Sequence, residues 1–290
     1  MEELTVKKDF SDIYTKKYPA PYLEEMKNVE YRIPDQTKPL YKHLTERMGN
    51  HLKRSINILD LGSSYGINSA LLNFELIMSE LDDFFIQQNP RPSIKEVQDF
   101  FDELPSKNPN LKFYLVDTSS PALEFAEKAG LCEGSFCVNM EKEPLPSEFK
   151  LALSNIDLII STGCIGYIGW KSFEKMFENI DQNSSPIFVF SVLRMFHMDE
   201  IENVFKKNGF EIIKTKIGPL KQRQFYNEEE MKKTIELLDK RGIDTHGLED
   251  TGCYFADFYI SGHSHAKSTW MPWVQNLEDV FIPIQASRHA

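Results

Sequence analysis

The sequence predicts an α/β fold in which helices cover both faces of one mostly parallel sheet. Short segments that are apolar almost throughout, such as residues 56–60 and 156–160, alternate with segments of helical periodicity. Such strands are typical of a parallel sheet buried on both faces, and right-handed crossovers then give a doubly wound structure. The 290-residue chain is 41% hydrophobic and 27% charged, an ordinary globular composition that suits one main domain with additions.

The expected strands and helices alternate along the middle of the chain. Strands are expected over residues 56–60, 112–117, 134–138, 156–160, 187–190 and 210–215, with a late aromatic-rich strand over 253–261. Helices are expected over residues 68–81, 121–129, 173–180, 199–208 and 227–241. Glycine follows three of these helices, at positions 130, 209 and 242, as expected for a helix C-terminus.

Three segments lie outside or interrupt this alternation. Residues 1–54, which are rich in tyrosine and proline, are expected to form an N-terminal helical cap that contains a helix over 38–48. The main domain spans 55–262, and about 80–110 reads as an inserted helix pair with apolar phenylalanines, which is a scaffold extension, a lid or an oligomer contact. Residues 263–290 form a tail whose Trp270, Trp273 and Phe281 are expected to pack loosely over the body.

The formal net charge of -11 argues against a nucleic-acid partner, since such binding depends on cations that face phosphates. The basic segment 206–223 is interpreted as a solvated face. No apolar run is long enough to span a membrane, and the start lacks a signal sequence. Four cysteines without CxxC spacing indicate free thiols in the cytoplasm, and no metal-ligand set can be assembled.

The loop after the first strand, Asp60-Leu-Gly-Ser-Ser-Tyr-Gly66, carries most of the functional information. In α/β folds a ligand binds beyond the carboxyl ends of the strands, and glycines let the backbone approach it. The pattern is D-x-G-x-x-x-G rather than the dinucleotide fingerprint G-x-G-x-x-G. An acid in front of the loop disfavours a pyrophosphate and suits a cation, such as the amino group of an amino-acid-like ligand.

Three further strand ends complete one adenosine-shaped site. Asp117 ends the second strand, where a carboxylate can bind both hydroxyls of a ribose. Asn139 follows the third strand and can meet an adenine amino group, and the small residues 161–166 after the fourth can lie against a flat ligand.

These segments resemble, in order, the motifs of class I S-adenosylmethionine-dependent methyltransferases. ILDLGSSYG resembles the first motif, FYLVDTSSPALEFA the second and DLIISTGCIGYI the fourth, while CVNMEKEPLP lies where that family contacts adenine. The resemblance covers residues 55–261, about seven-tenths of the chain. One departure is that Gly62 and Asp117 are 55 positions apart, whereas about 20 is usual.

The resemblance implies a seven-stranded, mostly parallel Rossmann-like sheet whose last strand, CYFADFYIS, is antiparallel. It also implies S-adenosyl-L-methionine as cofactor and S-adenosyl-L-homocysteine as product. The cofactor-binding residues that it implies are Asp60, Gly62, Ser63, Tyr65, Gly66, Asp117, Thr118, Asn139, Met140, Ser161, Thr162 and Gly163.

The subclass markers that are missing point to a small-molecule acceptor. There is no NPPY or DPPY after the fourth strand, Cys164 does not follow proline, and no carboxylate cluster indicates a catechol-type metal site. We therefore expect in-line O- or N-methyl transfer to a small molecule. Arg194 and Arg223, expected on loops that face the cofactor, favour an anionic or zwitterionic metabolite or natural product as the acceptor. Residues expected to contact the acceptor are Tyr18, Tyr22, Tyr167, Arg194 and Arg223, and His197 is the candidate base.

Three alternatives remain open at the level of sequence. They are a nicotinamide- or flavin-dependent oxidoreductase on a Rossmann sheet, a protein that binds an adenosyl ligand without catalysis, and a nucleic-acid methyltransferase. A homodimer is also left open.

Overall fold

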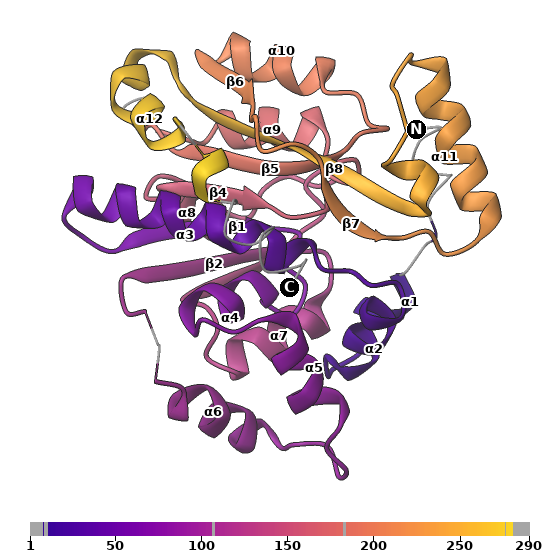
Figure 1. The fold of residues 1–290 in the computed structure, drawn as a ribbon. Helices are drawn as coiled ribbons and strands as arrows, with labels where there is room; N and C mark the ends of the chain where they lie inside the picture. The colour runs from indigo at the N-terminus through magenta and orange to yellow at the C-terminus, as the bar shows by residue number, and fades with distance from the viewer. Residues whose placement is uncertain (1–7, 9–10, 106–107, 182–183, 276, 281–290) are drawn as a thin grey trace.

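A computed structural model describes residues 8, 11–105, 108–181, 184–275 and 277–280. One eight-stranded sheet crosses the middle of the molecule, in the order β3-β2-β1-β4-β5-β8-β6, and β7 also pairs with β8 (Figure 1). The strands are β1 Ile56–Leu61, β2 Leu111–Asp117, β3 Gly134–Cys137, β4 Leu158–Ser161, β5 Ile187–Leu193, β6 Phe210–Lys214, β7 Leu220–Gln224 and β8 Cys253–His263. The first five are parallel to one another.

β8 is antiparallel to both of its neighbours, β5 and β6, which confirms the expected antiparallel last strand. The expected number of seven strands is wrong by one, because Leu220–Gln224 forms β7 on the amino-terminal half of β8. This LKQRQ segment is almost wholly polar, so it lacks the apolar run by which a strand is recognised. Its pairing partner lies more than 25 residues further along the chain.

The helices match the expected ones with three corrections. Their bounds are α1 Ser11–Tyr14, α2 Ala20–Asn28, α3 Ile33–Leu52, α4 Ile67–Asn73, α5 Met78–Ile86, α6 Ile94–Glu103, α7 Ser120–Lys128, α8 Ser147–Leu153, α9 Trp170–Phe177, α10 Asp199–Lys207, α11 Glu228–Lys240 and α12 Lys267–Val274. The helix expected over 68–81 is two helices, since Glu75 between them has a φ of 58°. α8 and α12 were not expected, and α3 continues through Pro39 to twenty residues.

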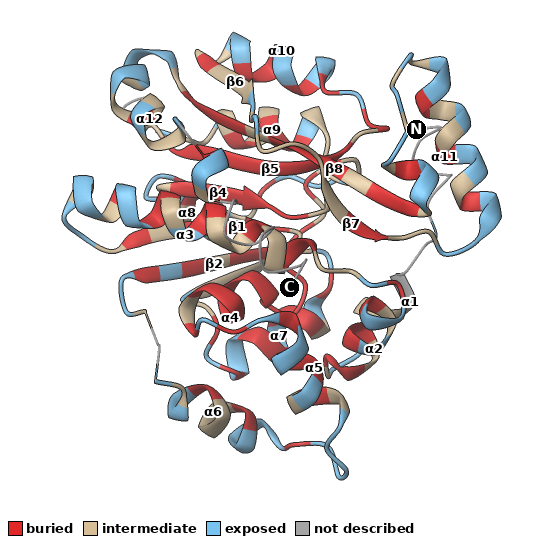
Figure 2. Ribbon diagram, viewed as in Figure 1, coloured by how far each residue is buried: buried red, intermediate tan, exposed pale blue. Residues whose placement is uncertain are grey.

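Both faces of the sheet are covered, as the apolar strands predicted. Every residue of β4 and β5 is buried (Figure 2). Successive side chains of a strand point to opposite faces, so complete burial requires packing on both.

The N-terminal cap and the insertion are helical, as expected, and they contact each other. α2 packs against α5, and Arg32 forms an ion pair of 3.2 Å with the buried Asp82 of α5. The insertion is the expected helix pair, α5 and α6, held by Phe84 and Phe100, whose rings stack at 3.9 Å. α6 lies below the sheet in Figure 1.

The expectation of a loosely packed tail is wrong for its described part. The Trp270 side chain of α12 is only 1% exposed, and its Nε1 donates to the carbonyl oxygen of His263. Gly262 leaves room for this ring, because a Cβ there would lie 2.6 Å from it. Phe281 lies outside the described residues.

Within the described ranges, no helix combines the length and the apolar character that crossing a membrane requires.

Candidate functional site

A tight loop joins β1 to α4 at the carboxyl edge of the sheet. The amides of Gly62 and Ser63 both donate to the carbonyl oxygen of Val116, which ties the loop to the end of β2. Ser64 has a φ of 51° and Gly66 a φ of 77°, left-handed conformations that are costly for serine and permitted for glycine. The hydroxyl of Ser64 is buried and finds no hydrogen-bond partner among the described residues.

Asp60 lies fully buried at the base of this loop. Nδ2 of Asn68 donates to both of its carboxylate oxygens at 3.1 Å and reaches Thr162 Oγ1 at 3.2 Å. Thr162 in turn shares a 2.7 Å hydrogen bond with the hydroxyl of Tyr41. Burial raises the pKa of Asp60 to about 8, with Asn68 acting against the shift. Sequence reasoning did not single out Asn68 or Tyr41 for this network.

Asp117, at the end of β2, is held rigidly beside the loop. Its Oδ2 accepts the amide of Ser64 at 2.8 Å, and its Oδ1 accepts the amide of Ser119 at 2.9 Å. Burial raises its pKa, and the backbone donors oppose that shift. Each oxygen retains a lone pair for a ligand hydroxyl. Thr118 follows Asp117, and its carbonyl oxygen accepts a hydrogen bond from the thiol of Cys137 at 3.6 Å.

The ends of β3 and β4 lie at the same edge. Asn139 is half-buried, with its Oδ1 accepting the amide of Lys142, and Met140 is buried. Gly163 donates its amide to Ser191 Oγ at 2.8 Å, and the preceding Ser161 is buried. The structure therefore brings the four predicted strand ends together.

The N-terminal segment, with Tyr14 and Tyr22, covers this edge of the sheet and is bonded to the glycine loop and to Ser119. The hydroxyl of Tyr65 donates to the carbonyl oxygens of Ile13 and Lys16, and Ser119 Oγ donates to that of Tyr14. The rings of Tyr22 and Tyr65 lie 5.6 Å apart, so Tyr22 packs against the glycine loop as expected of a neighbour of the site. Burial raises the pKa of Tyr14 and of Tyr22.

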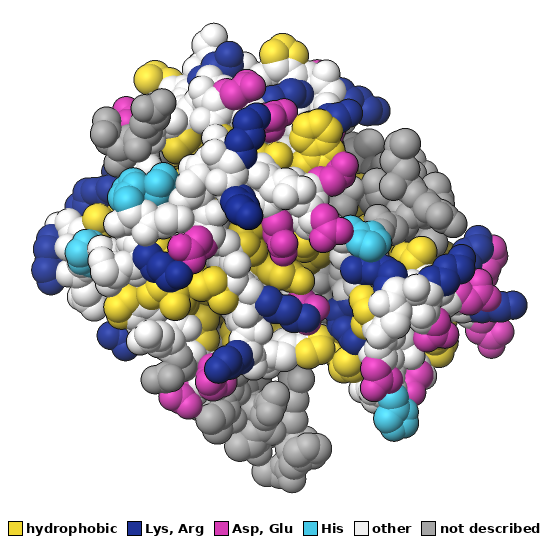
Figure 3. All heavy atoms as spheres, turned by 90° about the horizontal axis from the view of Figure 1, so that it is seen from above, with side chains coloured by type: hydrophobic (Ala, Val, Ile, Leu, Met, Phe, Trp, Pro, Cys, Tyr) yellow, Lys and Arg dark blue, Asp and Glu magenta, His cyan; other side chains and the backbone are white. Residues whose placement is uncertain are grey.

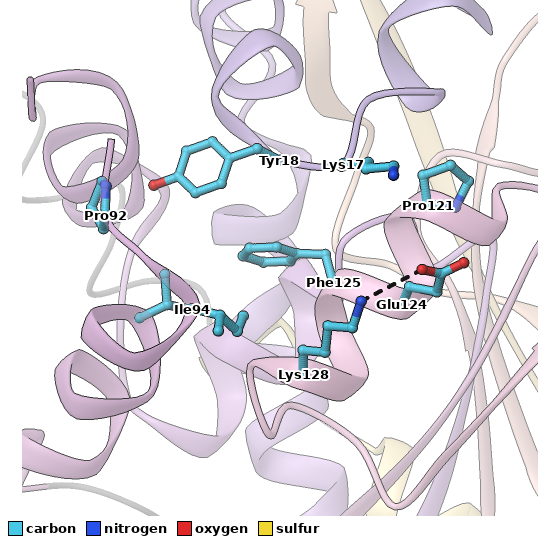
Figure 4. A pocket seen from close by; sticks show the side chains of 9 residues that line it. Lys17, Tyr18, Pro92, Ile94, Pro121, Glu124, Phe125 and Lys128 are labelled. Carbon is cyan, nitrogen blue, oxygen red and sulfur yellow. Dashed lines mark ion pairs between the residues drawn. The ribbon is translucent and has the colours of Figure 1, made fainter. Parts of the chain in front are cut away.

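Tyr18 faces a different cavity of about 170 Å³, bounded by the insertion and α7 (Figure 4). Its ring packs edge-on against Phe125 at 5.9 Å, and its hydroxyl points toward Pro92. The lining of this cavity contains none of the predicted cofactor residues. Tyr167, by contrast, follows β4 and is half exposed.

The two arginines expected to meet the acceptor each bind a buried glutamate. Arg194 donates to Glu249 at 2.6 Å, and its other nitrogen donates to the carbonyl oxygen of Asp244. Arg223 donates to both oxygens of Glu230, at 2.7 and 2.9 Å. Their role in binding the acceptor stays a prediction. The positive charge for which each arginine was chosen is paired with a glutamate carboxylate in the structure.

His197 lies on the surface after β5. Its side chain is 56% exposed, and its Nδ1 lies 3.8 Å from Asp199. Its role as a base stays a prediction.

Charges of both signs are interspersed on the face shown in Figure 3. Within the basic segment 206–223, three lysines form ion pairs: Lys207 with Glu174, Lys214 with Asp257, and Lys221 with Glu30. This favours the interpretation as a solvated face for the lysines, whereas Arg223 is buried and departs from it. In the part of the chain that the structure describes, no group of three or more His, Cys, Asp or Glu is placed to hold a metal ion.

The sheet itself separates this chain from the dinucleotide-binding folds. Those carry the order 3-2-1-4-5-6 in a mostly parallel sheet. Here the antiparallel β8 is inserted between β5 and β6, as the motif resemblance implied. The chain has the class I methyltransferase fold. The glycine loop, Asp117 and the ends of β3 and β4 lie at the edge where this fold binds its ligand.

No protein-family profile matches the sequence, and no curated protein matches it either. Among solved structures, magnesium protoporphyrin IX methyltransferase from Synechocystis, with bound S-adenosylmethionine, is 9% identical. It aligns over 91% of this chain and 98% of its own, with a TM-score of 0.43. The plantazolicin methyltransferase BamL, in complex with S-adenosylhomocysteine, is 11% identical over 91% of this chain and 99% of its own, with a TM-score of 0.44.

A third similar structure is WbdD, in co-crystal with a kinase inhibitor. It is 12% identical over 78% of this chain, with a TM-score of 0.40, and the chain spans only 40% of that protein. At TM-scores below 0.5 these likenesses add nothing to the fold assignment, which rests on the strand order.

Proposed function

We propose that the protein is an S-adenosylmethionine-dependent methyltransferase that acts on a small molecule. The observation that carries this is the geometry around Asp117. Its carboxylate is fixed by two backbone amides at the end of β2, one of them from the glycine loop, where it can bind a ribose. The buried acid Asp60 at the base of that loop favours a ligand with an amino group over a pyrophosphate.

The residues present suit such a ligand. The buried hydroxyl of Ser64 is without a partner among the described residues, so it is available to a ligand at the glycine loop. Asp117 would bind the ribose, Asn139 and Met140 the adenine, and residues 161–163 the remaining face. S-adenosylmethionine supplies a methyl group on a cationic sulfur, which the acceptor's oxygen or nitrogen takes as the sulfur–methyl bond breaks and its electron pair stays on sulfur. The protein's own task is to orient the acceptor and exclude water.

The tyrosines that cover the site support the exclusion of water. Tyr22 is buried and Tyr14 is partly buried at the site, and the Tyr65 hydroxyl fastens the segment that carries them. A site closed by this segment would keep water from the reaction.

We also propose that the protein works in the cytoplasm without a nucleic-acid partner. Its four cysteines, all of which the structure describes, form no disulfide, and such thiols are typical of a reducing compartment. The net charge of -11 counts against a polyanionic partner.

The proposal is tested by calorimetric titration of the protein with S-adenosylhomocysteine, S-adenosylmethionine, NAD and NADP. We expect the two adenosyl ligands to bind and the nicotinamides not to. Asp117→Asn should weaken S-adenosylhomocysteine binding about ten-fold or more, since a hydrogen bond to a charged group contributes about 1.5–3 kcal/mol.

A matched control exists at the opposite edge of the sheet. Asp157 precedes β4 and likewise accepts a backbone amide, from Asn57, at 2.9 Å. Asp157→Asn should leave the affinity within two-fold. Binding of NAD instead, or equal affinities of the wild-type protein and Asp117→Asn, would contradict the proposal.

A further inference from the structure

Gln222 is an extra residue in β7. Lys221 pairs with Phe255 and Arg223 pairs with Tyr254, so Gln222 forms a β-bulge between them. Bulges are frequent beside active sites, where they redirect a side chain. The Gln222 residue is only 3% exposed, yet its Oε1 is buried without a hydrogen-bond partner among the described residues. A buried carbonyl oxygen without a partner is unfavourable and calls for an explanation.

The Gln222 side chain points to the end of β4. A Cβ at Gly163 would lie 3.2 Å from Nε2 of Gln222 and 2.8 Å from the hydroxyl of Tyr31. The next residue, Cys164, lies against the glycine loop, since a Cβ at Gly62 would be 2.7 Å from its Cβ. Gln222 therefore lies beside Gly163 at the end of β4, next to the strand ends that we assign to the cofactor.

The backbone of Gln222 is held from both sides. β7 pairs with β8 on one edge. On the other edge, Arg32 donates its amide to the carbonyl oxygen of Gln222, and Gln224 donates its amide to that of Val29. The side chain is thus presented by a fixed backbone, as a recognition group requires.

The positive charge of the neighbouring Arg223 does not change what the side-chain amide oxygen of Gln222 can bind. Arg223 is engaged with Glu230 through two hydrogen bonds, so the pair is neutral as a whole. An unpaired amide oxygen attracts an N–H or O–H donor and repels a carboxylate.

We propose that Gln222 binds the methyl acceptor through Oε1, and that the acceptor presents a hydroxyl, amine or amide hydrogen rather than a carboxylate. This inference rests on the proposed function. An amide does not take up a proton, so Gln222 acts by orientation alone. The methylated product keeps the acceptor's proton as a cation and loses it to water when it leaves the closed site.

The first experiment requires no acceptor. Gln222→Met keeps the length of the side chain and removes its polar atoms. We expect a melting temperature equal to or above that of the wild type, because a buried oxygen without a partner is lost, and S-adenosylhomocysteine affinity within two-fold. Gln224→Met, on the same strand, is the matched control. A melting temperature lowered by several degrees in Gln222→Met alone would show a structural hydrogen bond and overturn the inference.

The second experiment uses methyl-deuterated S-adenosylmethionine and a panel of small alcohols, phenols, amines and amides with carboxylic acids of matched skeleton. We expect methyl ethers or N-methyl products. Gln222→Met should lower kcat/KM about ten-fold, mainly through KM, and Gln224→Met should not. Methyl esters alone, no product from any donor-bearing acceptor, or an unchanged kcat/KM in Gln222→Met would overturn the role of Gln222. Failure of S-adenosylhomocysteine to bind the wild-type protein would instead overturn the proposed function, and this inference with it.

Discussion

At the scale of single residues, the site combines buried acids with a strained loop. Asp60 is fully buried with one amide as its donor, and Ser64 holds a left-handed conformation. Strain and unpaired polar groups of this kind lower stability, and proteins retain them where function needs them.

The raised pKa of Asp60 gives a pH prediction. The folded protein binds a proton at Asp60 up to a pKa of about 8, whereas the unfolded chain releases it near 3.8. Asp60 therefore lowers the free energy of unfolding as the pH rises from about 4 to 8. Asp60→Asn should gain stability relative to the wild type across that range, measured as melting temperatures at pH 5 and pH 8.5.

The same variant should bind S-adenosylhomocysteine more weakly, and wild-type affinity should rise between pH 6.5 and 8.5 as Asp60 ionises and can pair with the ligand's amino group. A stability difference between the two proteins that does not change with pH would contradict the assigned titration.

At the scale of elements, ion pairs hold the region between β6 and β8 in place. Arg194 follows β5 and reaches Glu249 before β8, and Arg241 at the end of α11 donates to the carbonyl oxygen of Arg194. Arg223 of β7 holds Glu230 of α11 in the same way. The sequence predicted both arginines on loops that face the cofactor. The structure places Arg223 within β7 and pairs each arginine with a buried glutamate.

Breaking one of these pairs should cost stability. The Arg194 and Glu249 side chains are 10% and 1% exposed. Arg194→Ala leaves Glu249 buried and unpaired, which costs about 3 kcal/mol. We expect thermal unfolding several degrees lower with S-adenosylhomocysteine affinity unchanged.

The exposed pair of Lys207 and Glu174 provides the comparison, because Lys207→Ala should cost less than about 1 kcal/mol. Equal losses in Arg194→Ala and Lys207→Ala would refute the structural role of Arg194.

At the scale of the whole molecule, the N-terminal segment closes over the sheet edge and is fastened at several points. Tyr65 holds it to the glycine loop, Ser119 to the N-terminus of α7, and Arg32 to the insertion. Ligand exchange at the site then requires this segment to move.

Tyr65→Phe removes the hydroxyl whose single hydrogen is shared between the carbonyl oxygens of Lys16, at 2.7 Å, and Ile13, at 3.2 Å. A hydrogen bond contributes about 1 kcal/mol, so the dissociation rate of S-adenosylhomocysteine should rise about five-fold. Stopped-flow fluorescence measures it, with Tyr114→Phe of β2 as the control. A rate unchanged from the wild type would mean that the segment does not limit exchange.

The sheet, its parallel strands and the acids at their ends could be predicted from the sequence, because apolar runs and glycine loops are local patterns. It missed β7, whose polar residues pair only through a distant strand, and the split between α4 and α5 at Glu75. The folded chain was needed to show that Arg194 and Arg223 are paired, that Trp270 is buried and that Gln222 lies beside Gly163. Those facts depend on contacts between residues far apart in the chain, and such contacts leave no periodic pattern in the sequence.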